Sequence, residues 1–428
     1  MEVIRTIREK LEKAGLLPLR TQAVLSEKLL RDRLDNLLPR LMDECDVDMW
    51  LITAYENNED PVMKTLLTWD MRTARRLSAI MFCRNKETGA IDRLTWGIPF
   101  AKMKEFYTPV KEGDESLAEG VSRMIAKYQP KAVEINTKGE YGGFCDGLSA
   151  SLLEDLKKMP AEHAALLQPA ERISTRWLET MTDGELEVME VLVEVTEDII
   201  KAAYSRDVIT PGVTTTEDVE WFMRHVMAEC QLDFWFGPDI DLQRKGTPAY
   251  GFGGVIEAGD LVHCDIGVYL KYIPVLTDKQ WMAYVLREGE QAAPKGVHDL
   301  FAQGNRFQDI SCEGYLAGRT GNAVFHDGVN KAKAEGLTPS LYCHGLGTFG
   351  HGAGPIIGRW DHQDSIYPRG ELPVGESTSY ALELNIRGDL PEWDGQNVRI
   401  SLEEDIHVKK APRFVHGRQE KIIEIEFP

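Results

Sequence analysis

The chain has 428 residues, of which 43% are hydrophobic and 28% are charged, an ordinary composition for a globular protein long enough to form two domains. Its net charge of −20, from 69 acidic and 49 basic residues, argues against a nucleic-acid partner, which would need a basic face. No apolar run is long enough to span a membrane, and the opening MEVIRTIREKLEKAGLLPLR has no apolar signal core. The seven cysteines are dispersed without CxxC pairs, so we expect reduced thiols and a cytoplasmic protein.

The first part of the chain alternates between helical and strand-like patterns. Residues 1–40 carry apolar positions between charges at helical spacing. Short apolar runs at 48–55, 77–84 and 131–136 resemble strands, and the charged stretch 116–128 between them resembles a helix. This alternation predicts an α/β domain, which we place at residues 1–177.

A second domain is expected over residues 178–428. It begins with a long helix from Glu185 to Tyr204, for which Thr182 and Asp183 are candidate N-caps. A turn and a second helix follow, with Thr214 or Thr215 as its cap. Strand-like and helix-like stretches then alternate to the end of the chain, in the order strands (250–286), helices (296–337) and strands (341 onward).

Two aspartates lie in a predicted hairpin of this second domain. In LVHCDIGV, strand alternation places His263, Asp265 and Gly267 on one face. The chain then turns through LKYIPVLT to Asp278. An isolated strand aspartate is more often a turn or edge residue, but two carboxylates on paired strands can point at one metal ion.

Further candidate metal-binding or substrate-binding residues, two histidines and two glutamates, follow in the sequence. His344 and His351 lie seven residues apart in the glycine-rich CHGLGTFGHGAGP, where the backbone can pass close to a metal ion or a substrate. Glu383 is an acidic residue inside the apolar strand SYALELNI, which is unfavourable unless the carboxylate is paired or bound to metal. RISLEEDIHV offers Glu403, with Glu404 as the competing choice.

Four carboxylates and one imidazole can neutralise two divalent cations and leave room for a bridging water. Their order here resembles that of the pita-bread metallopeptidases, namely methionine aminopeptidase, aminopeptidase P and prolidase, with creatinase as a metal-free relative. HGLGTFGH matches the family's His-Gly-x-Gly-x-x-x-His pattern, and the resemblance extends over residues 178–428, whereas the first domain resembles the smaller domain of the prolidase branch by layout. The five matching residues are Asp265, Asp278, His344, Glu383 and Glu403.

The resemblance implies an α/β (α+β) fold, with a pita-bread domain after a smaller creatinase-type domain, and two divalent metal ions (Mn, Zn or Co). It implies that Asp278 and Glu403 bridge the ions, that Asp265 binds one ion, and that His344 and Glu383 bind the other. Glu383 would also move a proton to the leaving nitrogen. His351 would contact the substrate carbonyl or oxyanion. Arg399 matches a family arginine near the site, and a surface or structural salt bridge is a nearly equal alternative role for Arg399.

Two departures from the family pattern concern the surroundings of the site. The family's two aspartates are usually 11 residues apart, but here 278 minus 265 is 13, which places two extra residues around Tyr272–Val275. An even insertion preserves the face to which Asp278 points. The family's histidine upstream of the first aspartate has no counterpart between Phe236 and Val262. Aromatic residues there are expected either to line an apolar pocket or to pack in the core: Trp235, Phe236, Tyr250 and Phe252.

The leading hypothesis is a metal-dependent peptidase, an Xaa-Pro aminopeptidase or dipeptidase, that cleaves X-Pro bonds in short peptides by attack of a metal-activated hydroxide. The small first domain favours the aminopeptidase P and prolidase branch. An alternative is a hydrolase of a non-peptide C–N bond in a small metabolite on the same metals, and a third is an inactive binding module. The expected partners are a short peptide or small-molecule substrate and a second copy of the chain in a homodimer, with neither nucleic acid nor membrane.

Overall fold

The computed structural model describes residues 2–98, 100–141 and 144–426. The chain forms two compact units. The larger unit consists of Met1–Gln22 and Glu179–Pro428, and the smaller unit is Ala23–Leu178. The sequence analysis draws one boundary, between residues 177 and 178, and keeps residues 1–22 with the smaller domain, whereas this division lies after Leu178 and groups residues 1–22 with the larger unit.

The opening helix α1 (Glu2–Lys13) packs in the larger unit for a local physical reason. Its buried face carries Ile7 and Leu11, and it lies against the long helix α9 (Asp183–Ala203). Lys10 extends from α1 and forms ion pairs of 2.6 Å with both Glu194 and Asp198 of α9. Helical periodicity identified α1, but periodicity carries no information on the partner of its apolar face.

The smaller unit is built around a six-stranded sheet in the order β4-β3-β2-β1-β5-β6. Strand β1 is antiparallel to β2 and parallel to β5, so the three predicted strand-like runs are adjacent. The strands are β1 (Met49–Tyr55), β2 (Leu77–Arg84), β3 (Ile91–Trp96), β4 (Thr108–Pro109), β5 (Val133–Ile135) and β6 (Leu167–Pro169). The helices are α2 (Leu19–Asp32), which begins in the larger unit, α3 (Leu38–Glu44), α4 (Pro61–Leu66), α5 (Leu117–Tyr128), α6 (Ala150–Leu156), α7 (Ala161–Ala164) and α8 (Glu171–Glu179).

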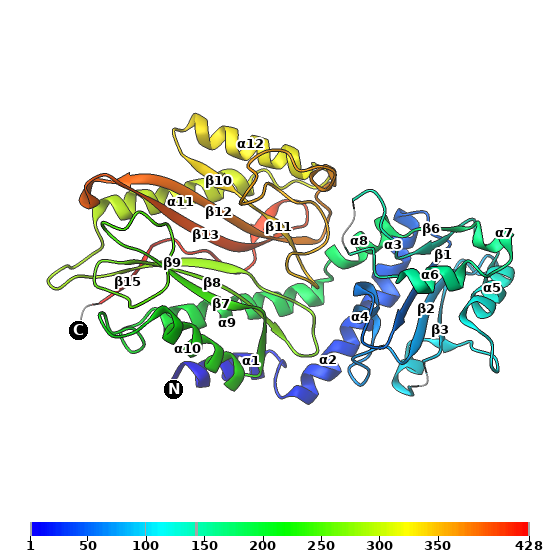
Figure 1. Cartoon of the computed structure of the whole chain (residues 1–428). Coiled ribbons are helices and arrows are strands. Elements are labelled where there is room, and N and C mark those ends of the chain that lie inside the picture. Colours follow the sequence, from blue (N-terminus) through cyan, green and yellow to red (C-terminus); the bar gives the residue numbers. More distant parts are fainter. Residues whose placement is uncertain (1, 99, 142–143, 427–428) are drawn as a thin grey trace. The chain divides into compact units, whose positions relative to one another are not determined.

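The larger unit contains a nine-stranded sheet whose main path is β10-β12-β13-β9-β8-β7, with β11, β14 and β15 paired beside it (Figure 1). The strands along the path are β10 (Pro339–Leu341), β12 (Thr378–Leu390), β13 (Gln396–Val408), β9 (Lys279–Val285), β8 (Leu261–Leu270) and β7 (Leu232–Gln243). The additional strands are β11 (His344–Leu346), β14 (Pro412–Phe414) and β15 (Ile423–Ile425). The two sheets and their helices make the whole an α/β fold, as predicted.

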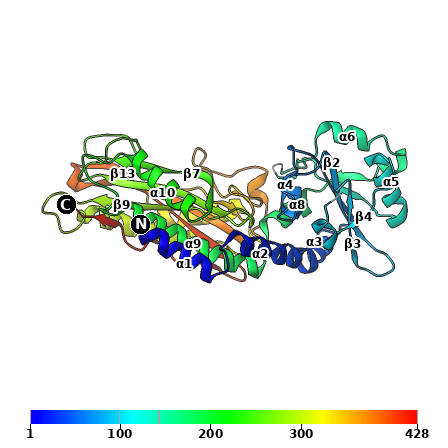
Figure 2. The ribbon, with the colours of Figure 1, turned by 90° about the horizontal axis from the view of Figure 1, so that it is seen from below.

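Helices cover this sheet in two groups. Helices α9 and α10 (Thr216–Glu229) pack on β8 and β7, and Figure 2 shows them beside α1. Helix α11 (Lys295–Cys312) packs on β12 and β13, and α12 (Gly321–Ala334) packs against α11. Thr182 caps α9 and Thr215 caps α10, each in a reciprocal capping box with the third residue of its helix. Within the part of the chain that the structure describes, no helix is both long and apolar enough to cross a membrane.

The pairing of four strands positions the predicted site. Strands β12 and β13 pair along their whole lengths, which places Glu383 opposite Glu403. Strand β13 meets β9 at the single pair Glu403–Gln280, and β8 pairs with β9 so that Asp265 also lies opposite Gln280. Alternate residues of β12 and β13, such as Leu384, join the apolar core against α11. The opposite face of these strands is therefore left to polar side chains.

Candidate metal centre

Three of the five predicted ligands meet in one buried group. Ligand atoms of Asp278, His344 and Glu403 lie within 4.8 Å of one another. The His344 Nε2 atom is 3.4 Å from Asp278 Oδ2 and 3.8 Å from Glu403 Oε1. Asp278 precedes β9, His344 begins β11 and Glu403 lies within β13, so sheet pairing brings together residues far apart in the sequence.

The His344 ring is oriented so that its Nε2 could bind a metal ion. Its Nδ1 lies 3.1 Å from the Gly345 carbonyl oxygen, which can only accept, so Nδ1 carries the proton and Nε2 presents its lone pair to the two carboxylates. Burial lowers the pKa of His344 to about 3, which keeps the ring neutral. Gly345 is needed beside it, because a Cβ there would lie 2.1 Å from the Ala353 carbonyl oxygen.

The two remaining predicted ligands flank this group. Asp265 on β8 and Glu383 on β12 lie on strand positions directly opposite Gln280 and Glu403, respectively. Burial raises the pKa of Asp265 to about 7 and that of Glu383 to about 8, and the Asp265 charge contributes to the second shift. Burial and the neighbouring carboxylates raise the pKa of both Asp278 and Glu403 well above the usual range.

The donor set fits divalent cations. Glu403 Oε1 and Asp265 Oδ1 are buried without a hydrogen-bond partner. The lone pair of His344 Nε2 points at carboxylate oxygens, so acceptors converge there. Unpaired buried acceptors are unfavourable unless a cation binds them. Carboxylate oxygens with one imidazole nitrogen suit Mn²⁺, Zn²⁺ or Co²⁺.

Gln280 is a residue of this centre that the sequence analysis did not identify. Its amide nitrogen donates to Glu383 Oε1 at 2.9 Å and to Glu403 Oε2 at 2.8 Å. Its amide oxygen lies 3.0 Å from His263 Nε2, and His263 Nδ1 lies 3.1 Å from Asp241 Oδ2. The side chains of Asp241, His263 and Gln280 therefore form a hydrogen-bonded chain that ends on two predicted metal ligands. Strand alternation from Asp278 would have placed Gln280 on the same face.

The opposite face of the same strands holds a buried ion-pair cluster. Lys279, next to Asp278, contacts Glu404 and lies 3.3 Å from Glu197. Glu404 also accepts hydrogen bonds from Trp281 Nε1 and the Gln419 backbone N–H. The structure thus places Glu404, the competing choice to Glu403, on the opposite face from the group of Asp278, His344 and Glu403.

His351 lies next to the group in an aromatic environment. Its ring centroid is 4.5 Å from that of His344 and 5.6 Å from that of Trp235. The Trp235 ring is fixed because its Nε1–H donates to the Thr277 carbonyl oxygen at 3.0 Å. Trp235 also covers Gly267, where a Cβ would lie 2.0 Å from its Nε1.

Of the other predicted aromatic residues, Phe236 packs edge-on against Trp235, and Tyr250 and Phe252 lie beneath arginines. Tyr250 lies under both Arg387 and Arg399, and Phe252 lies under Arg244. Arg399 is on the same face of β13 as Glu403 but four residues before it, and its Nε is buried without a partner. The Arg399 side chain makes no salt bridge in the described part of the chain.

The two extra residues of the hairpin are packed inside the larger unit. The Tyr272 backbone N–H donates to Gln22 Oε1 at 2.8 Å. The side chains of Ile273 and Val275 are 1% and 2% exposed. The insertion is therefore held by apolar burial and by a hydrogen bond to the first turn of α2. The family's histidine upstream of the first aspartate has no counterpart here, and His263 is the nearest histidine in the sequence. Both ring nitrogens of His263 are hydrogen-bonded, Nδ1 with Asp241 and Nε2 with Gln280.

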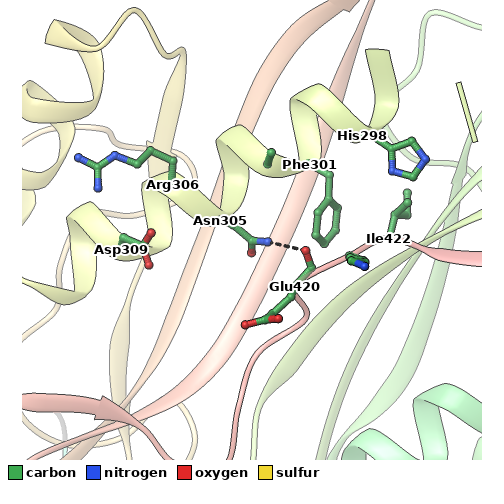
Figure 3. Close-up of a pocket in the computed structure, with 9 residues that line it drawn as sticks. His298, Phe301, Asn305, Arg306, Asp309, Glu420 and Ile422 are labelled. Atoms are coloured by element: carbon green, nitrogen blue, oxygen red, sulfur yellow. Dashed lines mark hydrogen bonds between the residues drawn. The ribbon is translucent and has the colours of Figure 1, made fainter. Parts of the chain in front are cut away.

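A separate hollow of about 500 Å³ lies between α11 and residues 420–422 (Figure 3). Several of its polar groups pair with each other or with adjacent residues, and Asn305 Oδ1 is buried without a partner. Asn305 donates to the Glu420 carbonyl, Arg306 pairs with Glu335 and Asp309 pairs with Arg418. Its one unpaired buried acceptor is an amide oxygen, whereas carboxylates and an imidazole converge in the group of Asp278, His344 and Glu403, so the hollow is the weaker candidate for a catalytic site.

No protein-family model and no curated protein matches this sequence. Solved structures do resemble it. The X-Pro aminopeptidase from Thermotoga maritima has a TM-score of 0.64 at 14% identity, over 90% of this chain and 100% of its own. The Xaa-Pro dipeptidase from Bacillus anthracis has a TM-score of 0.57 at 16% identity, over 94% and 100% of the two chains. The prolidase from Pyrococcus furiosus has a TM-score of 0.57 at 15% identity, over 89% and 100%. The chain therefore has the pita-bread fold of these metallopeptidases, as the sequence predicts.

Proposed function

We propose that the chain is a peptidase that uses two divalent metal ions to cleave the bond before a proline residue in short peptides. The observation that carries the proposal is the buried group of Asp278, His344 and Glu403, in which Glu403 Oε1 has no hydrogen-bond partner and no lysine or arginine of the described residues makes an ion pair. The names of the structural neighbours, which are X-Pro aminopeptidases, dipeptidases and prolidases, support the same reaction class.

Five side chains would hold the ions: Asp265, Asp278, His344, Glu383 and Glu403. Bound ions would acidify a water molecule and polarise the carbonyl group that it attacks. Glu383 is positioned by Gln280 and is our candidate for moving a proton from that water to the leaving nitrogen. His351 would donate a hydrogen bond to the oxygen that gains negative charge. Arg399 would act on the substrate from the same sheet face.

The surroundings of His351 suit a proline substrate. Proline lacks a backbone N–H and has a fixed φ, so a pocket for it needs an apolar surface more than a backbone acceptor. The Trp235 ring is held in place by its bond to Thr277 and stands edge-on to His351. A rigid aromatic side chain at this position offers an apolar contact for the proline ring.

A hydrolase of a non-peptide C–N bond is the second candidate. The observation that favours it is that both ring nitrogens of His263 are hydrogen-bonded, with Asp241 and Gln280. His263 therefore does not replace the family's upstream histidine in contacting a substrate. Such an enzyme would use the same five ligands on a smaller substrate. The two candidates differ in substrate and share the metal requirement.

Elemental analysis of the purified protein tests the metal centre. We expect two ions per chain in the native protein and a reduced number in both Asp265→Ala and Glu403→Ala. Asp299→Ala is the matched control, because Asp299 is an exposed acidic residue on α11 paired with Lys295. A metal content that neither ligand substitution changes would contradict the assignment.

Steady-state assays with saturating Mn²⁺ test the substrate. We expect cleavage of Ala-Pro or Ala-Pro-Ala in preference to Ala-Ala-Ala. Activity on the tripeptide would indicate an aminopeptidase, and activity on the dipeptide alone would indicate a dipeptidase. Fully metallated protein that cleaves no proline peptide would favour the non-peptide hydrolase. The expected homodimer is a separate proposal, which sedimentation equilibrium would test.

A further inference from the structure

A tyrosine outside the predicted site residues lies beside the two histidines of the glycine-rich segment. The Tyr342 ring centroid is 5.5 Å from that of His344 and 5.8 Å from that of His351. Tyr342 lies two residues before His344, the first residue of β11, so alternation along an extended chain places both side chains on one side. Cys343, between them, belongs to the apolar core of the larger unit. The Tyr342 ring therefore borders the candidate metal centre.

The backbone of Tyr342 is fixed to the strand that carries a predicted ligand. The Tyr342 N–H donates to the Glu383 carbonyl oxygen of β12 at 3.1 Å. The next residue, Cys343, exchanges two backbone hydrogen bonds of 2.9 Å with Ile357. Because these bonds hold the chain at the ring, the phenol can interact with a ligand at a smaller cost in conformational entropy.

The hydroxyl group of Tyr342 is available to a ligand. Its side chain is half-buried, and among the residues that the structure describes it has no hydrogen-bond partner. By contrast, the buried hydroxyl groups of Tyr107 and Tyr204 donate to the carbonyl oxygens of Leu66 at 2.8 Å and Trp281 at 3.2 Å. A tyrosine hydroxyl usually finds a partner when it is buried, so a ligand that covers Tyr342 would have to supply an acceptor.

The charges of the metal-ligand group reach this hydroxyl. Burial and the charges of Glu383, Glu403 and Asp278 raise the pKa of Tyr342. The phenol therefore lies within electrostatic range of three predicted ligands. Even an ordinary tyrosine is protonated at neutral pH, so the hydroxyl has a proton to donate.

We propose that the Tyr342 hydroxyl is a second catalytic hydrogen-bond donor, which acts with His351 on the oxygen of the attacked carbonyl group. This inference rests on the proposed peptidase function. When the carbonyl carbon is attacked, its double bond to oxygen becomes a single bond and the oxygen gains a negative charge. The Tyr342 O–H donates a hydrogen bond to that oxygen and keeps its proton.

The spacing of the two rings suits a shared acceptor. A hydrogen bond spans about 3 Å between heavy atoms, so donors on rings whose centroids are 5.8 Å apart can both reach one oxygen between them. A donor directed at the developing charge stabilises the transition state more than the bound substrate. The loss of the hydroxyl should therefore lower kcat and leave KM unchanged.

Replacement of Tyr342 by phenylalanine tests this role, because it removes the hydroxyl and keeps the ring. We expect Tyr342→Phe to lower kcat on Ala-Pro-Ala by about 10²-fold, the lower end of the loss for one such donor, with native KM and native metal content. Tyr367→Phe is the matched control, because Tyr367 is 73% exposed, and it should leave kcat unchanged. A native kcat in Tyr342→Phe, a change confined to KM, or a loss of metal would overturn the proposal.

A binding measurement separates this proposal from the peptidase function. Calorimetry on metal-loaded protein would use an Ala-Pro-Ala analogue in which a tetrahedral phosphinic group replaces the cleaved amide bond, and the product Pro-Ala, which lacks that group. Binding of the analogue at least about tenfold weaker in Tyr342→Phe, with Pro-Ala binding unchanged, would support the role of the hydroxyl even if no proline peptide is cleaved. Equal binding of the analogue by both proteins would overturn it and leave the proposed cleavage reaction intact. An analogue that the native protein does not bind would overturn it as well.

Discussion

Replacement of Lys279 by methionine is the sharpest test of how the fold supports the carboxylate group. Lys279 and Glu404 have fully buried side chains in direct contact, and Glu197 is 3.3 Å from the lysine nitrogen. Burial favours the neutral amine, but the Glu404, Asp405 and Glu197 carboxylates outweigh it and raise the pKa of Lys279. Removal of one partner from a buried ion pair costs about 3–5 kcal/mol, because the other charge is left uncompensated.

We expect Lys279→Met to fall at the lower end of that range. Glu404 keeps two hydrogen bonds, from Trp281 Nε1 at 2.9 Å and from the Gln419 N–H at 2.7 Å. A loss of about 3 kcal/mol corresponds to a decrease in Tm of about 6–12 °C for a unit of this size. Denaturant unfolding of the metal-free protein at neutral pH would measure the loss directly.

Two further variants make the explanation refutable. The double variant Lys279→Met/Glu404→Gln removes both charges but keeps an acceptor for Trp281 and Gln419, so it should recover at least half of the loss. Lys295→Met removes an exposed lysine that is paired with Asp299, and it should change the unfolding free energy by less than about 1 kcal/mol. A loss below about 1 kcal/mol in Lys279→Met, or no recovery in the double variant, would refute the reasoning.

Three other predictions concern the site. Gln280→Met removes the donors to Glu383 and Glu403, so metal affinity measured by calorimetry should fall by about 10–100-fold; unchanged affinity would show that Gln280 does not position these ligands. His351→Ala should keep its metal content but lose about 10²–10³ in kcat, and loss of metal would identify His351 as a ligand instead. The metal-free protein should lose stability as pH rises from about 5 to 8, because folded Asp265 and Glu383, with raised pKa values of about 7 and 8, still hold protons that the unfolded chain has released. Urea unfolding at several pH values checks this, and a metal-free protein that becomes more stable over that range would contradict it.

Local patterns predicted the secondary elements well, because the physics behind them is local. Apolar patterns located α9 and the strands β1, β2 and β5 of the smaller unit, and capping chemistry offered Thr182 and Asp183 as the start of α9, of which the structure selects Thr182. It also reduced the start of α10 to two candidates, of which the structure selects Thr215. Strand alternation indicated that Asp265 and His263 share a face, which the pairing with β9 agrees with.

The sequence by itself determined which residue types can form the site: four carboxylates and an imidazole in motifs with strand and glycine-rich character, on a chain that resembles one fold family. The pairing of strands that lie more than a hundred residues apart in the sequence decided which residues those side chains contact. It placed the Gln280 amide between Glu383 and Glu403, turned Glu404 to the opposite face toward Lys279, and set Arg387 against Arg399. A one-residue change in register would exchange the two faces of a strand, and register depends on packing between distant segments, which no local pattern records.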